Sequence, residues 1–279
     1  MRRQQGQQRR DGGFTLSELM IVIPISAIVM GTLYMFMVTL YMNNLKHIGR
    51  LDVVSQVNAS LNIMREDIAL SMGPSANLGG DVTDSYGPPG GGSWAGSSST
   101  PFSTLIVKMP TTTAPTVNPN RELVRINQNG CTAAAMASNP VYSYRAVYYV
   151  HENNLYRRNV MDSTPPSLCQ TPIQTMTCPT YVTAPANCVK DTLLATHVTK
   201  FEARYQVGTV GNAPSESCPA GSTFNQNTAE DVLYLCDSDT IAGASVVTVV
   251  LEQARRIDGK DFAYAHRFTV GNFTGDEDE

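Results

Sequence analysis

The strongest pattern in the chain is a run of residues without a charged side chain, from Leu19 to Leu40. At about 1.5 Å of helix rise per residue the run reaches roughly 33 Å, which is enough to cross a hydrocarbon core of about 30 Å. Lipid offers the backbone no hydrogen-bond partner, so an open segment that crosses a bilayer must be helical. The pattern therefore predicts one membrane-spanning helix near the N-terminus.

The same helix is predicted to continue beyond the run, from Thr15 to Ser71. After Leu40 the apolar residues recur at steps of three and four, which indicates an amphipathic helix with one buried stripe. Gly73 and Pro74 then end it. Pro24 lacks a backbone donor, so a kink is expected there. The stripe is predicted to consist of Leu45, Ile48, Leu51, Val54, Val57, Leu61, Met64, Ile68 and Met72.

A change of period marks the second part of the chain. Residues 73–102 are rich in Gly, Ser and Pro and predict a long surface loop with little order. Beyond them apolar and polar residues alternate, which indicates strands, and His151-Glu152-Asn153 reads as the turn of a hairpin. The expected strands are Thr104–Met109, Glu122–Asn127, Val141–Val150, Asn154–Val160, Val198–Val207, Val232–Leu235, Ser245–Glu252 and Phe262–Val270.

Charge adds an orientation. Four arginines precede the apolar run, whereas Lys46 and Arg50 are the first basic residues after it. This asymmetry predicts a cytoplasmic N-terminus, with the bulk of the protein on the far side of the inner membrane. The net charge is −4, and it becomes −7 without residues 1–13. An acidic protein of this kind argues against a nucleic-acid partner.

The cysteines fit the same compartment, because all six follow the membrane segment. An even number of cysteines in an oxidising compartment predicts disulfides. Zinc is the alternative, but the chain has no Cys-x-x-Cys pair. The preferred pairing is Cys218 with Cys236, which would close a Gly/Asn-rich loop. The disulfide candidates are Cys131, Cys169, Cys178, Cys188, Cys218 and Cys236.

The residues before the apolar run do not fit an ordinary secretory signal. The pair Gly12-Gly13 precedes the run, where a secretory signal has its small residues after it. Glu18 places a carboxylate at the edge of the run, where an ionisable group costs up to a few kcal/mol and implies a partner. The alternative is a plain signal anchor whose Glu18 reaches the lipid headgroups.

A basic leader, then Gly-Phe-Thr-Leu-Ser-Glu-Leu at residues 13–19 and an apolar helix, resembles the signal of type IV prepilins and type II secretion pseudopilins. The resemblance implies that a prepilin peptidase cuts between Gly13 and Phe14 and methylates the new amino group of Phe14. It also implies that Glu18 pairs with the N-terminal amine of a neighbouring subunit. The other implied partners are major and minor pilins or pseudopilins and the inner-membrane assembly platform.

A second resemblance concerns the strands. The segments Val147–Val150, Leu155–Arg158, Val198–Tyr205 and Ser245–Leu251 are similar to W-type minor pilins and J-type minor pseudopilins. The expected fold is α+β and pilin-like, with a long N-terminal transmembrane and amphipathic helix packed on a C-terminal antiparallel β-sheet domain. The expected parts are a leader (1–13), a transmembrane half-helix (14–42), an amphipathic half-helix (43–72), the loop (73–102) and a periplasmic β-rich domain with disulfides (103–279).

The sequence favours assembly over catalysis, since it holds no recognisable catalytic or zinc motif. The expected function is that of a minor pilin that primes or tips a type IV pilus. The alternatives are a minor pseudopilin of type II secretion and a signal-anchored periplasmic enzyme or sensor. No cofactor or metal is expected, although Glu230, Asp231, Asp237 and Asp239 could form a calcium cage instead of a solvated turn.

Overall fold

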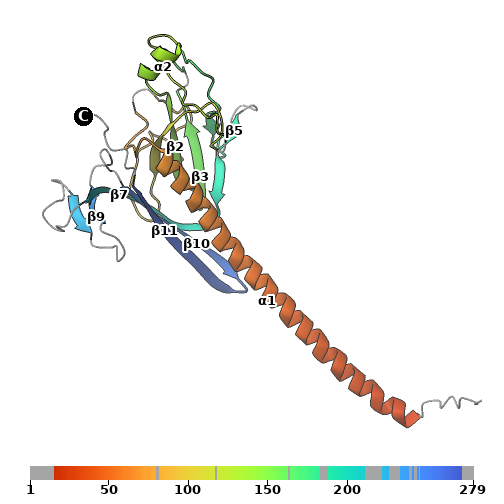
Figure 1. Ribbon diagram of the computed structural model, residues 1–279. Coiled ribbons are helices and arrows are strands. Elements are labelled where there is room, and N and C mark those ends of the chain that lie inside the picture. The colour runs from red at the N-terminus through yellow and green to blue at the C-terminus, as the bar shows by residue number, and fades with distance from the viewer. Residues whose placement is uncertain are drawn as a thin grey trace, which may run out of the picture. The chain divides into compact units, whose positions relative to one another are not determined.

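The computed structural model describes residues 16–79, 82–116, 118–162, 164–182, 188–210, 222–225, 233–238, 241, 244 and 246–271, with only the backbone for 206–210, 222–225 and 233–238. The chain forms two compact units, residues 1–51 and residues 52–279. The elements confirm the α+β, pilin-like fold, with a long N-terminal helix and a C-terminal antiparallel sheet domain (Figure 1).

Helix α1 runs from Leu16 to Leu70, one residue short of the prediction at its C-terminal end, and the predicted first residue, Thr15, lies outside the described residues. Pro24 lies inside it, and the kink at this residue stays a prediction. The helix ends as Ser71 donates to the carbonyl of Ile68 through both its N–H and its hydroxyl. Gly73 then takes a positive φ of 116°, a conformation that favours glycine.

The chain beyond α1 forms two antiparallel sheets (Figure 1). The four-stranded sheet has the order β1-β2-β3-β6, with β1 at Leu105–Pro110, β2 at Ser143–His151, β3 at Asn154–Val160 and β6 at Thr192–Ala195. The five-stranded sheet has the order β11-β10-β7-β9-β8, with β7 at Val198–Val210, β8 at Ser222–Asn225, β9 at Leu233–Ser238, β10 at Val246–Ile257 and β11 at Lys260–Gly271. A short parallel pair, β4 (Thr177–Cys178) with β5 (Val189–Lys190), and helix α2 (Ala133–Ser138) complete the fold.

Two tight turns set the register of the hairpins. Glu152 and Asn153 join β2 to β3, and Asp258 and Gly259 join β10 to β11. All four residues have positive φ values, between 49° and 73°, as two-residue type I′ turns require. The first hairpin was predicted, and β3 has the predicted bounds. The Asp-Gly turn is an equally clear signal that the sequence interpretation did not use.

The main core lies between the last turns of α1 and the two sheets. Val57, Leu61, Met64 and Ile68 are buried there among residues of β1, β2, β7 and β10. The predicted stripe was therefore right in its middle and wrong at its ends. The first buried apolar residue is Val53, whereas the predicted stripe members Leu45, Ile48, Leu51 and Met72 are exposed.

A second core involves residues 73–102, whose described part forms no helix or strand, as expected of a loop. The segment covers the other face of the four-stranded sheet, where its Leu78, Val82 and Trp94 are buried against Ile106 and Val147. Backbone bonds anchor its beginning to β1, among them Ser75 N to Ile106 O at 2.8 Å. Among its described residues only these three are buried, and they fix on the sheet a segment that its Gly and Pro content correctly predicts to be largely a surface loop.

The predicted strand Glu122–Asn127 was wrong, since the segment forms only isolated bridges to Thr112, Val141 and Leu168. These three partners lie in different segments, so no continuous ladder can develop. Apart from β3, whose bounds agree, the other predicted strands exist with shifted ends, and β4, β5, β6, β8 and α2 were missed.

Candidate processing and assembly segment

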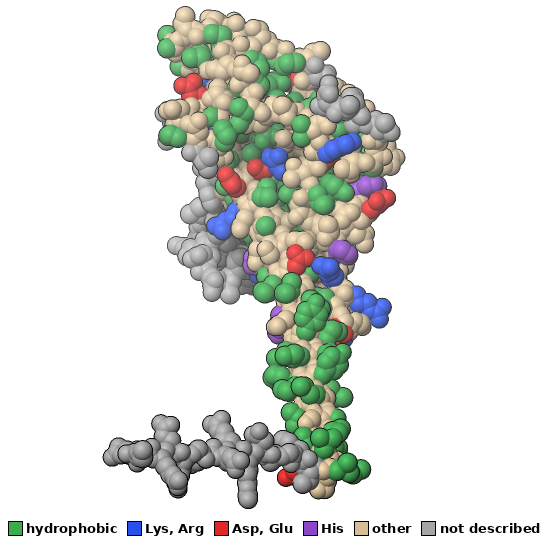
Figure 2. All heavy atoms as spheres, turned by 90° about the vertical axis from the view of Figure 1, so that its right-hand side faces the viewer, with side chains coloured by type: hydrophobic (Ala, Val, Ile, Leu, Met, Phe, Trp, Pro, Cys, Tyr) green, Lys and Arg blue, Asp and Glu red, His purple; other side chains and the backbone are tan. Residues whose placement is uncertain are grey.

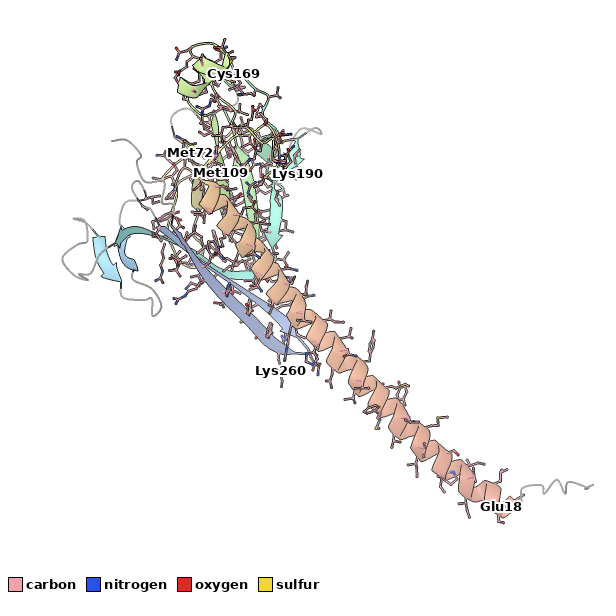
Figure 3. All side chains as sticks on the ribbon, in the orientation of Figure 1. Glu18, Met72, Met109, Cys169, Lys190 and Lys260 are labelled. Atoms are coloured by element: carbon pink, nitrogen blue, oxygen red, sulfur yellow. A yellow bond between two sulfur atoms is a disulfide. The ribbon has the colours of Figure 1, made fainter. Side chains whose placement is uncertain are left out.

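The predicted processing site, Gly13 and Phe14, lies outside the described residues, which begin at Leu16. Glu18 is exposed in the first turn of α1 (Figure 3). The first helical N–H groups carry partial positive charge, so a carboxylate is favoured at this position.

The apolar run makes no use of the protein's own core. Every large apolar side chain from Leu19 to Leu40 is exposed, with Met20 71% and Tyr34 70% accessible. By length and composition α1 could cross a membrane, and its most apolar window has no buried residue. Figure 2 shows hydrophobic side chains along the visible side of this stretch. An apolar surface this large needs lipid or other protein surfaces around it.

The second part of α1 is fixed to the four-stranded sheet by a polar cluster. Asp67 accepts a hydrogen bond from Arg157 Nε at 2.6 Å and another from the hydroxyl of Tyr148, which is fully buried. Arg157 also donates to Tyr144 Oη at 3.2 Å. Burial and the charge of Asp67 hold the pKa of Tyr148 well above its usual value, so the phenol stays protonated and donates.

The next residue along β3 points to the opposite face and forms the second cluster. Arg158 is fully buried and donates to Asp84 at 2.7 Å, and Asp84 also accepts from Trp94 Nε1 at 2.6 Å. The guanidinium lies 5.4 Å from the ring centre of Tyr86 and 5.9 Å from that of Trp94, within reach of cation–π attraction. Asp84, Tyr86 and Trp94 all belong to the segment 73–102, so this cluster secures that segment on the sheet.

A third polar group borders the second core. Asp191 is buried and accepts from Tyr149 Oη at 2.7 Å and from Thr177 Oγ1 at 2.6 Å. Burial raises the pKa of Asp191 above its usual value, although both hydrogen bonds oppose that rise. Nearby, burial raises the pKa of Tyr181 to about 12, and its hydroxyl donates to Gly87 O at 2.6 Å. The arrangement joins the irregular segment around β4 to the sheet.

Four cysteines form two disulfides. Cys131 pairs with Cys169, beside α2 (Figure 3), and Cys178 pairs with Cys188. For these four cysteines the structure therefore shows disulfide bonding, and the zinc alternative does not apply to them. The preferred pair Cys218–Cys236 lies outside the residues whose side chains are described, as does the calcium candidate set. Within the described residues no group of three or more His, Cys, Asp or Glu could hold a metal ion.

The three polar clusters, around Asp67, Arg158 and Asp191, were not predicted from the sequence. The sequence interpretation did not single out Asp67, and it placed Arg157 and Arg158 only as part of a strand. Two adjacent arginines must point to opposite faces of a strand, and both faces here are covered. Adjacent charges in the middle of a hairpin were thus a signal that both faces carry buried acidic partners.

Comparison with known proteins adds one finding at the N-terminus. Residues 8–34 match the prokaryotic N-terminal methylation motif, which includes Gly13, Phe14 and Glu18. No curated protein and no solved structure matched the chain. The motif supports the type IV prepilin and pseudopilin family, with processing by a prepilin peptidase and assembly with other pilins. Together with the apolar helix it fits a membrane-anchored, pilin-like subunit, and proteins with this motif are generally structural.

Proposed function

We propose that the chain is a minor pilin-like subunit that a prepilin peptidase processes and that then primes or tips a type IV pilus. Its activity is assembly and not catalysis. In the inner membrane the mature protein begins at Phe14, residues 14–42 span the bilayer once, and the domain from residue 43 onward lies in the periplasm. The assembly platform then moves it into the filament with other major and minor pilins.

The methylation motif at residues 8–34 is the observation that carries the proposal. The exposed apolar run supports it, because every large side chain from Leu19 to Leu40 is available to lipid or to neighbouring helices. The excess of arginine before the run supports the cytoplasmic position of Gly13. Glu18, at the motif's acidic position, is the residue proposed to pair with the amine of Phe14 of a neighbouring subunit.

The same motif supports a second candidate, a minor pseudopilin of a type II secretion system. Both kinds of subunit use the same processing and the same kind of helix. The neighbouring genes distinguish them, since a pilus cluster encodes a retraction motor and a secretion cluster encodes the secretion components.

Intact-mass analysis of the membrane-extracted protein, made with and without an active prepilin peptidase, tests the proposal. With the peptidase we expect a mass that lacks residues 1–13 and carries one added methyl group. Without it the full-length mass should remain. A mass that retains residues 1–13 in both cases would favour a signal-anchored enzyme or sensor, and a mature N-terminus beyond residue 30 would contradict the proposal.

A further inference from the structure

Strand β11 forms one edge of the five-stranded sheet over its whole length. It pairs with β10 through twelve consecutive residue pairs without a bulge. Among the described residues no strand pairs with its outer side. A long, regular edge without proline is a template for an added strand, and proteins usually block such edges.

The type I′ turn determines which backbone groups face outward. In a two-residue hairpin the flanking pair, Ile257 with Lys260, is hydrogen-bonded on both sides. The alternation then directs the N–H and C=O groups of Asp261, Ala263, Ala265, Arg267 and Thr269 away from β10. An independent hydrogen bond supports this assignment of the outward-facing groups. Ala254, which lies opposite Ala263, donates its N–H to the carbonyl of His197 and therefore does not donate it to β11.

The core-facing side chains of β11 are left partly open at the same edge. Tyr264, Phe268 and Val270 pack against the main core but are only partly buried, and His266 on the same face is exposed. All five residues with outward-directed backbone groups are exposed on the other face. A strand placed beside β11 would therefore cover apolar surface as well as gain backbone bonds.

A cavity lies beneath this edge, between α1 and β11. It measures about 260 Å³ and is lined by Asn58, Leu61, Asn62, Arg65, His266 and Phe268. Its lining includes the apolar side chains of Leu61 and Phe268 and the basic side chains of Arg65 and His266. Side chains of an added strand that point toward the core would enter this space, and a carboxylate among them would meet Arg65.

We propose that β11 and this cavity bind an extended segment of a neighbouring filament subunit, which continues the sheet as an added strand. The segment carries apolar residues at alternate positions and a carboxylate that meets Arg65 and His266. Its main chain pairs with Asp261, Ala263, Ala265, Arg267 and Thr269. The inference rests on the proposed function, because the partner is a subunit of the same assembly.

The test uses the full-length chain expressed with its filament system, and it measures the amount in sheared filaments. Ala265→Pro removes one outward N–H and leaves the bonds to β10, because proline is tolerated on the open side of an edge strand. We expect the amount of this variant in filaments to fall about tenfold, because the added strand loses one hydrogen bond and the bonds next to it are weakened. Ala265→Ser keeps the N–H and is the matched control, which should incorporate normally.

Two further measurements keep the inference testable if Ala265→Pro unfolds, as a thermal melt would reveal. Arg65→Glu changes an exposed side chain of α1, leaves the sheet intact and should also reduce incorporation. Amide exchange over residues 260–271 should show about half of the amides protected in the detergent-solubilised protein and nearly all protected in filaments.

Normal incorporation of Arg65→Glu, or unchanged amide protection in filaments, would overturn the inference and leave the proposed function standing. Failure of the unmodified chain to enter filaments would overturn the proposed function, and the proposed partner with it.

Discussion

The two stretches of α1 use the same kind of residue for different purposes. From Leu19 to Leu40 the side chains are almost all apolar and the large ones are all exposed. From Asp52 to Leu70 the helix is mixed, and its apolar residues Val53, Val57, Leu61, Met64 and Ile68 are buried in the protein's own core. The less apolar stretch is the one that stabilises the fold.

The difference shows that hydrophobicity alone does not identify a core helix. The mixed stretch has one apolar stripe and a polar remainder, as a helix on a sheet requires. The uniformly apolar stretch has no polar face to expose to water, so it requires lipid or other helices around it. The fold thus depends on the second stretch of the helix, whereas the proposed pairing of subunits through Glu18 depends on the first, so each can be tested without the other.

The largest expected effect comes from cutting the helix at two places. A chain without residues 1–42 should be soluble and folded, because the buried stripe remains. A chain that begins at Ser75 loses all five buried apolar residues, each worth about 1.5–3 kcal/mol, against a typical net stability of about 5–15 kcal/mol. We expect it to aggregate. Thermal melts and size-exclusion chromatography of both chains check this, and a monomeric Ser75 chain that melts like the longer one would contradict it.

A matched pair of isoleucines gives the next effect. Ile68 is 1% exposed and Ile48 is 62% exposed, although both were predicted on one stripe. In the chain without residues 1–42, Ile68→Ala should lower the free energy of unfolding by about 2–5 kcal/mol because it leaves a cavity. Ile48→Ala should change it by no more than about 0.5 kcal/mol. Denaturant titration measures both, and equal losses would remove the distinction between the stretches.

A smaller difference in stability loss is expected between a largely buried and an exposed ion pair. Asp67 and Arg157 are about 15% exposed, and Asp67 also accepts from the buried Tyr148. Asp52 and Arg255 form a pair at 2.9 Å in which both side chains are 46% exposed. Asp67→Ala should cost about 3 kcal/mol because it leaves buried donors without an acceptor, and Asp52→Ala less than about 1 kcal/mol. A larger loss from Asp52→Ala in denaturant titration would contradict this account.

The sequence predicted those parts of the fold whose signals are local. The period of α1, the end at Gly73 and the β2–β3 hairpin each depend on a few neighbouring residues, and all three agree with the structure. The ends of the buried stripe could not be predicted, because burial at Ile48 or Met72 depends on whether a sheet reaches them. Local periodicity is the same in both cases.

The segment 73–102 shows the opposite limit. Its composition is that of a loop, yet Asp84 and Trp94 bind the buried Arg158, which lies far away in the sequence. The adjacent arginines of β3 indicate that buried acidic partners exist, but no local pattern shows that Asp84 is one of them. For the candidate site the case is reversed: the motif at Gly13, Phe14 and Glu18 is read from the sequence alone, and the described structure begins only at Leu16.

The most direct test of the central claim compares Glu18→Ala with Glu66→Ala, which removes an exposed carboxylate from the second stretch of α1. Each variant is expressed alongside wild-type subunits, and its amounts in the membrane and in sheared filaments are measured. The account predicts equal membrane levels for both variants, because Glu18→Ala only makes the apolar stretch more apolar, and reduced incorporation for Glu18→Ala alone. Normal incorporation of Glu18→Ala would contradict the claim that this stretch pairs subunits through its carboxylate.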